Sequence, residues 1–425
     1  MVKLKIQNFG PIKNGFIEND GFLEFTPVTL FCGNQATGKS TIAKLYSTLS
    51  WVEKSFVKQD LLNFLTDEVA TIPEVFFVNN LKKQKLDEYF SNQTIIEYKG
   101  QAYNFKYENG EFSYSKSATF NEYVRPKIMY IPSDRNLLTS LEEADKVKNL
   151  PEMLSIMFDE YNSARKRLNG TGYALPISNI KIKNDKERNS IRVITGENSS
   201  ISIYNASSGI QSVAPLSLVT RSIAFDIFLE EKKGFQDLSA YERELFKRKF
   251  FDESKIPNDL KPSMMNYTEH LFNYYTSIDK GNKLLKNFFN RCFINIVEEP
   301  EQNLYPDSQG QVLYELLEYL NWSNENRLVI TTHSPYILSY LTLSAKAAEL
   351  KNKSIPKEKI NKLVPFESVV SGNKISVYET QENGSVIKLK TYDNLPSDNN
   401  MLNNALDNSN EIFAQLIELE DEYHA

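Results

Sequence analysis

The segment Gly33–Ser40 constrains the fold of this chain more than any other. It reads Gly-Asn-Gln-Ala-Thr-Gly-Lys-Ser, which satisfies the pattern of a phosphate-binding loop. In that pattern backbone N–H groups surround the phosphates, the lysine reaches the β- and γ-phosphates, and the final hydroxyl ligates Mg²⁺. An apolar strand pattern at 28–32 precedes the loop, and apolar residues at helical spacing follow it from Thr41. The order of strand, loop and helix therefore predicts a site for a nucleoside triphosphate.

The whole loop and the first residue after it are predicted to bind ATP. These residues are Gly33, Asn34, Gln35, Ala36, Thr37, Gly38, Lys39, Ser40 and Thr41. The start of the following helix adds its positive dipole to the phosphate site. Within the set, Lys39 is also expected to act in catalysis, and Ser40 to ligate Mg²⁺.

Composition indicates a large globular protein. The chain has 425 residues, of which 41% are hydrophobic and 24% charged, so it can bury two or three lobes. No apolar run approaches the roughly 18 residues that a membrane helix needs, and the N-terminus lacks a signal-peptide core. We therefore expect a cytoplasmic protein with no membrane partner.

Charge and cysteine content exclude two further classes. The net charge of −6 argues against a general nucleic-acid binder, although residues 181–188 and 351–362 are locally basic. Cys32 and Cys292 each lie in an apolar strand-like run, which favours reduced core residues over a disulfide or a metal site.

The hydrophobic pattern predicts an α/β protein with one β-rich lobe, at about 70–127, and one helical lobe. Strands are expected at 2–9, 15–25, 28–32, 127–131, 180–183, 191–195, 200–204, 293–297 and 327–332. Asn-Gly turns predict hairpins at 103–114 and 375–390. Helices are expected at 41–46, 52–66, 137–168, 213–229, over most of 230–289, and at 411–423.

Polar groups follow three of the predicted strands. Ser133-Asp134-Arg135 follows the first, Glu298-Glu299-Pro300-Glu301 the second, and His333 the third. A Mg²⁺-dependent triphosphatase needs a carboxylate for the metal and a base for the attacking water, and the adjacent Glu298 and Glu299 supply both. A histidine on a neighbouring strand can contact the γ-phosphate.

The order of these elements resembles that of ABC-type ATPase heads, and in particular the bacterial AAA-15/OLD-like ATPases. The resemblance covers residues 1 to about 340. It implies an α/β fold, an ABC-type P-loop ATPase head with an antiparallel β lobe, a mixed core sheet and a helical signature lobe. It also implies four segments. These are residues 1–135 (P-loop and β lobe), 136–290 (helical and signature lobe), 291–340 (Walker B and switch histidine) and 341–425 (C-terminal hairpin and helix).

The resemblance also implies roles for individual residues. Gly33–Thr41 corresponds to Walker A and residues 302–305 to the D-loop. The signature motif supplies four further nucleotide-binding residues: Ser207, Ser208, Gly209 and Gln211. The catalytic set is Glu299, Glu298, His333 and Lys39, with Ser40, Glu298 and Asp134 as metal ligands.

The chain departs from the family pattern at three positions. Glu298 stands where ABC proteins usually have aspartate, although Glu-Glu-Pro-Glu is familiar in the OLD-like branch. Tyr305 stands where that branch often has histidine. The corner at Asp134 has no glutamine, although this is the position of the Q-loop.

The signature of one such head does not normally reach its own nucleotide. The resemblance therefore implies that two chains sandwich two ATP molecules with Mg²⁺, each signature facing the γ-phosphate bound by the other chain. A homodimer is expected, within a higher homo-oligomer.

Features absent from the sequence narrow the choice of subfamily. An SMC-like protein needs a long coiled coil between loop and signature, yet Ser40 and Ser207 are 167 positions apart and no heptads span the interval. An OLD nuclease carries a Toprim domain after the head, but the roughly 85 residues after Tyr340 have no Asp-x-Asp pair. The chain thus resembles a stand-alone ATPase subunit with a separate effector.

Size, the opening Asn-Phe-Gly-Pro-Ile and the short tail resemble the ATPase subunits of PARIS anti-phage systems. That resemblance implies two partners, a Toprim-type nuclease held inactive and a phage-encoded trigger protein such as a DNA mimic. Three alternatives stay open. One is a Septu-like ATPase that works with an HNH nuclease, another is a RecF-like repair ATPase that clamps DNA, and the third is a nucleotide-gated scaffold with negligible turnover.

Overall fold

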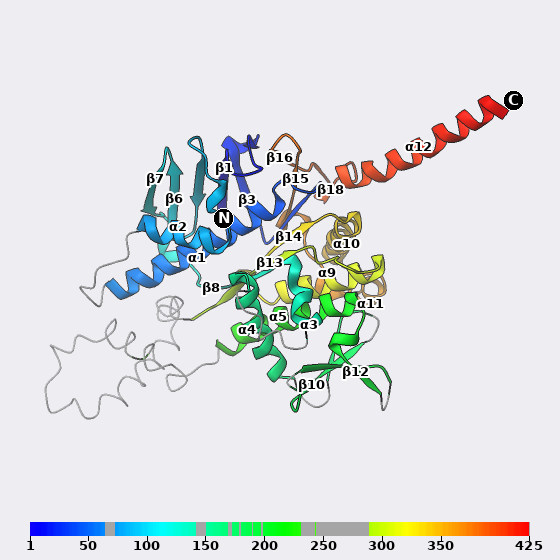
Figure 1. The fold of residues 1–425 in the computed structure, drawn as a ribbon, viewed down its shortest axis with the longest axis horizontal. Coiled ribbons are helices and arrows are strands. Elements are labelled where there is room, and N and C mark those ends of the chain that lie inside the picture. Colours follow the sequence, from blue (N-terminus) through cyan, green and yellow to red (C-terminus); the bar gives the residue numbers. More distant parts are fainter. Residues whose placement is uncertain are drawn as a thin grey trace.

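The computed structural model describes residues 1–63, 73–141, 150–168, 172–177, 180–188, 190–196, 199–230, 243 and 289–424. At its centre is a seven-stranded mixed sheet in the order β2-β16-β15-β4-β14-β13-β8 (Figure 1). Its strands are β2 (Gly15–Phe16), β16 (Ser385–Lys388), β15 (Ile375–Thr380), β4 (Val28–Gly33), β14 (Arg327–Thr332), β13 (Cys292–Glu298) and β8 (Pro126–Ile131). The five strands from β15 to β8 run parallel, whereas β16 is antiparallel to β15. The carboxyl ends of the parallel strands therefore meet at one edge of the sheet, where ligands of such sheets bind.

A second, fully antiparallel sheet forms the β lobe, in the order β3-β1-β5-β6-β7. Its strands are β3 (Phe22–Phe25), β1 (Val2–Gln7), β5 (Ile95–Lys99), β6 (Tyr103–Glu108) and β7 (Glu111–Lys116). Two helices, α1 (Lys39–Asn63) and α2 (Pro73–Lys83), pack against it. Phe56 of α1 makes edge-to-face contacts with Tyr103 and Phe105 of β6. The helix that begins at the P-loop is thus anchored in the β lobe.

The helical lobe lies beyond the other face of the central sheet. It contains α3 (Leu137–Ser140), α4 (Glu152–Lys166) and α5 (Ser208–Glu230), and a small sheet of β9 (Tyr173–Ala174), β10 (Lys181–Asp185), β11 (Ser190–Ile194) and β12 (Ser200–Ser202). One continuous core joins this lobe to the central strands and to α9 (Pro306–Leu320) and α10 (Pro335–Asn352).

Helix α5 is apolar almost all round. Within the described residues, one helical segment, Ser208–Leu229, is long and apolar enough to cross a bilayer by length and composition alone, although no such run was expected from the sequence. However, 72% of its most apolar stretch is buried inside the fold. Its apolar character therefore matches a central core helix.

The C-terminal segment completes the central sheet. Strand β15 pairs in parallel with β4, the strand that leads into the P-loop, and β16 pairs with β2 near the N-terminus. The remaining elements are α11 (Lys357–Asn361), the short pair β17 (Thr391–Tyr392) and β18 (Leu395–Pro396), and α12 (Met401–His424). In Figure 1 α12 extends away from the body of the molecule.

Most of the elements predicted from the sequence are present in the structure, but the bounds of several differ from the prediction. The helices expected at 41–46 and 52–66 are one helix, α1, described to Asn63. The strand expected at 15–25 is interrupted by a turn at 19–21, where Asp20 has a positive φ of 54°. Both Asn-Gly hairpins are confirmed. The helical prediction for 230–289 lies almost wholly outside the described residues.

The helix expected at 137–168 is wrong in its continuity. Helix α3 ends at Ser140, and α4 begins at Glu152 directly after Pro151. Proline has no N–H to continue an incoming helix and fits at a helix start, which explains the break. The last helix begins at Met401, ten residues before the predicted start, because Asn400 accepts hydrogen bonds from the backbone of Leu402 and Asn403.

Candidate functional site

The P-loop has the strand-to-helix geometry that the sequence predicts. Strand β4 ends at Gly33 and helix α1 begins at Lys39. Gly33 and Gly38 have φ values of 144° and 104°, which L-residues with side chains rarely adopt. A Cβ on Gly38 would also lie 2.4 Å from Cδ1 of Ile12. The loop therefore requires glycine at both positions, and its tip at residues 34–36 is exposed.

The C-terminal hairpin holds the P-loop from the side. The Thr37 and Thr380 hydroxyls lie 2.6 Å apart, and Nδ2 of Asn34 donates to Glu382 at 3.0 Å. Thr380 also donates to the carbonyl of Cys32. No motif marks Thr380 or Glu382 in the sequence, because only the pairing of β15 with β4 brings them to the loop.

Lys39 is buried at the base of the loop. Its Nζ donates to the carbonyls of Gly33 at 2.9 Å and Asn34 at 2.6 Å. Burial lowers the pKa of Lys39 to about 8, against the opposing attraction of Glu299. A desolvated ammonium held only by neutral carbonyls gains most from an anionic partner, and a phosphate oxygen is such a partner.

The two carboxylates at the end of β13 occupy different environments. Glu298 is buried, and its Oε2 accepts a hydrogen bond from the backbone N–H of Ser133 at 3.1 Å. Glu299 is half-exposed and has a φ of 44°, a strained value for a residue with a long side chain. Burial, and then the neighbouring Glu298, raise the pKa of Glu299. Strain of this kind is typical of functional positions.

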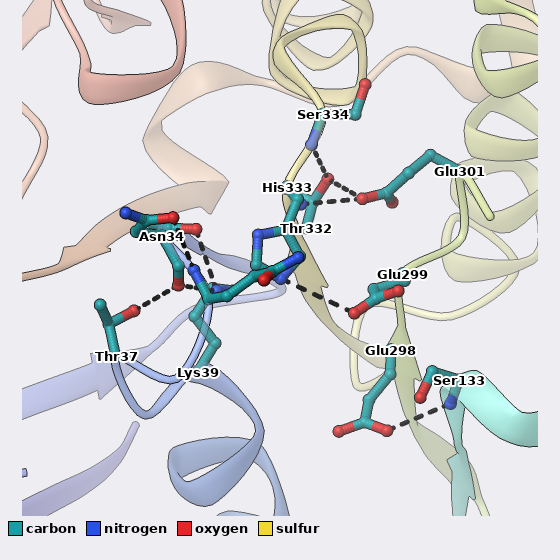
Figure 2. Close-up of polar contacts among 12 residues, drawn as sticks. Asn34, Thr37, Lys39, Ser133, Glu298, Glu299, Glu301, Thr332, His333 and Ser334 are labelled. Atoms are coloured by element: carbon teal, nitrogen blue, oxygen red, sulfur yellow. Dashed lines mark hydrogen bonds and ion pairs between the residues drawn. The ribbon is translucent and has the colours of Figure 1, made fainter. Parts of the chain in front are cut away.

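His333 follows β14, which lies between the P-loop strand and the acidic strand. Its Nε2 lies 3.7 Å from Oε1 of Glu299, as Figure 2 shows. Burial, and then the charge of Lys39, lower the pKa of His333, so the imidazole is neutral at pH 7. Lys39, at the start of the helix after β4, thus lies near Glu299 and His333, which follow the neighbouring strands β13 and β14.

Glu301 is a buried carboxylate to which the sequence analysis gave no separate role. Its Oε1 accepts hydrogen bonds from Oγ1 of Thr332 and from the backbone N–H of His333, both at 2.8 Å. Burial raises the pKa of Glu301. These contacts fix the backbone that carries the His333 ring (Figure 2).

Arg135 is fully buried and joins three parts of the site. Its Nη1 donates to the Glu298 carbonyl and its Nη2 to the Glu299 carbonyl, both at 2.7 Å. Its Nε donates to the carbonyl of Ser212 in α5 at 3.2 Å. Burial lowers its pKa to about 10, so the guanidinium stays charged at pH 7. At this corner the sequence prediction named only the exposed neighbour Asp134, as a metal ligand, and the place of Arg135 directly after an apolar strand was the one signal that could have pointed to it.

The signature segment lies at the start of α5, with Ser207 and Ser208 exposed. Gly209 packs on the loop after β13, where an added Cβ would lie 2.8 Å from the carbonyl oxygen of Asn303. Gln211 is buried, and its Nε2 donates to two carbonyls of the 203–204 turn. The serines therefore face solvent, while Gly209 and Gln211 hold the segment in place.

Oxygen donors are available for a divalent cation. Ser40 is the second residue of α1 and Glu298 ends β13, while the exposed Asp134 follows Ser133, whose backbone N–H donates to Glu298. Among the described residues no three His, Cys, Asp or Glu side chains gather closely enough to hold a metal by themselves. A hydroxyl and a carboxylate fit Mg²⁺, which usually takes one or two protein oxygens together with phosphate oxygens and water.

The order of strands in the central sheet determines which site residues become neighbours. The strand bearing His333 lies between the P-loop strand and the acidic strand, with an antiparallel lobe and a helical signature lobe attached. This arrangement has the parts that the sequence predicted, namely a mixed α/β core sheet, an antiparallel β lobe and a lobe that carries the signature segment. No protein-family model matches the chain, and no curated protein matches it by sequence.

Three solved structures are similar in overall arrangement. One is an SMC head domain from Thermotoga maritima, with a TM-score of 0.36 and 10% identity over 92% of this chain and 98% of that chain. Another is an Smc head bound to the C-terminal winged-helix domain of ScpA, with a TM-score of 0.36 and 8% identity over 91% and 96%. The third, derived from Pyrococcus furiosus, is an Smc head with an extended coiled coil bound to the C-terminal domain of ScpA. Its TM-score is 0.33, with 8% identity over 98% and 100%.

Proposed function

We propose that this chain binds ATP with Mg²⁺ and hydrolyses it to ADP and phosphate. The observation that carries the proposal is the convergence of Lys39, Glu299 and His333 at the carboxyl ends of three adjacent strands. Phosphoryl transfer needs positioned charge and a group that orients the attacking water, and these three side chains supply both.

Each residue has a distinct part in this mechanism. Lys39 exchanges its two carbonyl partners for phosphate oxygens, and the loop amides bind the remaining charge. Glu299 accepts the proton of the attacking water, a task favoured by its raised pKa. The neutral His333 donates a hydrogen bond toward the γ-phosphate. Ser40 and Glu298 would hold Mg²⁺, which would supply positive charge to the phosphates.

We also propose that two chains close on two ATP molecules. Support comes from the exposed Ser207 and Ser208, which stand at a helix N-terminus and so offer an anion site to another chain. ATP binding closes this sandwich and hydrolysis opens it, which provides a two-state switch.

Replacing Lys39 tests the nucleotide site. Lys39→Ala should abolish ATP binding measured by isothermal titration calorimetry, while circular dichroism shows an unchanged fold. Lys44→Ala is the matched control, because Lys44 lies in the same helix and is partly exposed. Equal ATP affinity in wild type and Lys39→Ala would sink the central claim.

Replacing Glu299 separates a hydrolytic switch from a scaffold. Glu299→Gln keeps the size of the side chain but removes the proposed base. Because hydrolysis is then blocked, ATP should hold the two chains together as a dimer, which analytical ultracentrifugation would detect. Turnover should fall by roughly 10²-fold or more. If biological function survives Glu299→Gln, the nucleotide-gated scaffold is the better model.

In the cell, we propose that this ATPase belongs to an anti-phage system and resembles AriA, the ATPase subunit of PARIS systems. It would hold a separate Toprim-type nuclease and release it when a phage-encoded protein, such as a DNA mimic, is sensed. Support comes from the motif order and from the short interval between loop and signature. Co-purification of the chain with the product of its neighbouring gene tests this: a Toprim nuclease supports the proposal, and an HNH nuclease favours the Septu-like alternative.

A RecF-like DNA clamp makes a different prediction. Duplex DNA should then bind with strong salt dependence, and reversal of Lys181, Lys183 and Lys186 to glutamate should remove the binding. The net charge of −6 favours the opposite result, with no duplex binding at physiological salt.

A further inference from the structure

The helical lobe contains a cavity of about 280 Å³ that has no part in the proposed ATP site. Its walls come from the end of α4, from Gly172 and Tyr173, and from the second half of α5. Apolar side chains line much of it, namely Ala164, Leu168, Leu218, Phe225 and Leu229. A cavity of roughly 150 Å³ is large enough for a benzene ring. This cavity therefore has room for a ring that carries a further group, which is the size of a small organic ligand.

Arg221 of α5 is partly buried on the wall of this cavity and has aromatic rings as its neighbours. Its Cζ lies 4.4 Å from the ring centre of Tyr173 and 5.2 Å from that of Phe225. A ring face attracts a guanidinium but does not accept its in-plane N–H donors as an oxyanion does. In the part of the chain that the structure describes, Arg221 forms no ion pair and donates no hydrogen bond. Its donors are therefore available to an anion from outside.

Arg167, the other charged residue on the wall, is already paired. Directly after α4, it donates to Oδ1 of Asp226 and, at 3.2 Å, to the hydroxyl of Ser222. The second carboxylate oxygen of Asp226 accepts a hydrogen bond from Lys127 at 2.6 Å. Asp226 thus has two cationic partners, and neither of them is Arg221.

Glu315 of α9 binds Tyr173 and Ser217 rather than Arg221. Its Oε1 accepts hydrogen bonds from the hydroxyl of Tyr173 and, at 2.8 Å, from that of Ser217. Burial raises the pKa of Glu315 to about 7, so about half of this carboxyl group is protonated at neutral pH. The local charge around Arg221 therefore stays positive, and the hydroxyl of Tyr173 holds its ring in place.

We infer that this cavity binds a small organic acid, in which a flat apolar group carries one carboxylate or phosphate. The oxyanion accepts hydrogen bonds from the N–H groups of Arg221, and the apolar group lies against Leu218 and Phe225. An occupant contacts the helix that begins at the signature residue Ser208, because α5 supplies half of the wall. The inference does not rest on the proposed ATPase activity.

Tryptophan fluorescence reports on this cavity. The chain has two tryptophans, and the ring of Trp322 meets that of Phe225 edge to face, with 5.3 Å between ring centres. In the full chain with Trp51→Phe, Trp322 is the only tryptophan. Titration with benzoate or with phenyl phosphate should give a saturable change in its fluorescence, with a Kd of about 1 mM or below. The probe that binds more tightly identifies the preferred anion as carboxylate or phosphate.

Benzyl alcohol tests whether the charge of the probe matters. It has the aromatic ring of benzoate without the negative charge, so it leaves the donors of Arg221 without an anionic partner. It should therefore bind about tenfold or more weakly than benzoate.

Replacing Arg221 tests the residue itself. Arg221→Met keeps an unbranched stem but removes the charged donors, so the affinity for both probes should fall about tenfold or more. Arg188→Met removes an exposed arginine elsewhere in the helical lobe and is the matched control. Lys39→Ala should bind the probes as tightly as the Trp51→Phe chain does, because the P-loop forms no part of this cavity. Circular dichroism checks that each variant is folded.

Three results would overturn the inference. The first is that neither probe changes the fluorescence of Trp322 at concentrations up to about 20 mM. The second is that benzyl alcohol binds as tightly as benzoate, which would make the cavity an apolar site only. The third is unchanged affinity in Arg221→Met. If that variant does not fold, Arg221→Lys takes its place, because it keeps the charge but lacks the planar set of donors and should still weaken binding several-fold. None of these results bears on ATP binding, which is measured separately with Lys39→Ala.

Discussion

At the scale of single residues, the site depends on the buried guanidinium of Arg135. Arg135 donates hydrogen bonds to backbone carbonyls at the end of β13 and in α5. It thereby fixes the backbone of Glu298 and Glu299 without acting on a nucleotide itself. A lysine could not replace it, because one ammonium cannot reach three carbonyls in the planar geometry of a guanidinium.

Arg135→Ala should lower the free energy of unfolding by about 3 kcal/mol or more, because buried carbonyls lose charged donors. The measurement is urea unfolding at neutral pH, followed by circular dichroism. Arg188→Ala removes an exposed arginine and should change stability by less than about 0.5 kcal/mol. Equal effects of the two variants would refute the role given to Arg135.

Lys39 gives a prediction about pH. Its pKa is lowered to about 8 in the folded chain, against an ordinary value of 10.5. Between these values the unfolded chain binds more protons, so this group makes the folded state more stable as pH rises. Relative to Lys39→Met, the wild type should therefore gain about 3 kcal/mol of stability from about pH 7.5 to about pH 10.5. A stability difference that stays constant across this range, measured by urea unfolding without nucleotide, would contradict the lowered pKa.

At the scale of elements, the start of α5 and the loop after β13 act as one unit. Gly209 packs on the backbone of Asn303, and Oγ of Ser212 donates to Oε1 of Gln302 at 3.3 Å. The exposed serines of the signature are thus positioned by the same loop that follows Glu299. A movement of this loop would shift both Glu299 and the exposed serines at 207 and 208.

Gly209→Ala should therefore disturb both groups. The added Cβ would lie 2.8 Å from a backbone oxygen, which has little freedom to move, so the helix start must shift. We expect a loss of about 1–2 kcal/mol in the free energy of unfolding and weaker ATP-dependent dimerisation. Ser208→Ala, at the exposed neighbour, should leave stability nearly unchanged. If Gly209→Ala is as stable as Ser208→Ala, the helix start is not held by this contact.

At the scale of the whole molecule, the two ends of the chain depend on each other. Strand β15 is buried along its length and pairs with β4, while β16 pairs with β2. The last part of α12, in contrast, is exposed. The folding unit therefore extends to the C-terminal hairpin but not to the end of the last helix.

Two truncations test this division. A chain ending at Asp407 should keep a melting temperature within about 3 °C of the full chain, because it loses mainly exposed side chains. A chain ending at Lys374 loses β15 and β16, leaves the edge of β4 unpaired, and should fail to fold. Thermal circular dichroism of both chains is the measurement. A folded chain ending at Lys374 would show that the hairpin is dispensable.

The sequence alone determined the features that arise from contiguous residues. The glycines and the lysine of the P-loop, the polar ends of three strands and the two Asn-Gly hairpins follow from local spacing and turn chemistry. It also predicted the fold class, because the order of these motifs along the chain is that of an ABC-type head. The assignment of nucleotide, partners and segment boundaries stays a prediction.

Only the tertiary structure decided which side chains support the site. Arg135 reaches across 77 residues to Ser212 and 163 residues to Glu298, and Thr380 across 348 residues to Cys32. No local periodicity encodes such contacts, because they depend on which strands become neighbours in the sheet. A P-loop is recognisable before the chain folds, but a buried arginine or a strand beside the loop acquires its role only when distant segments pack together.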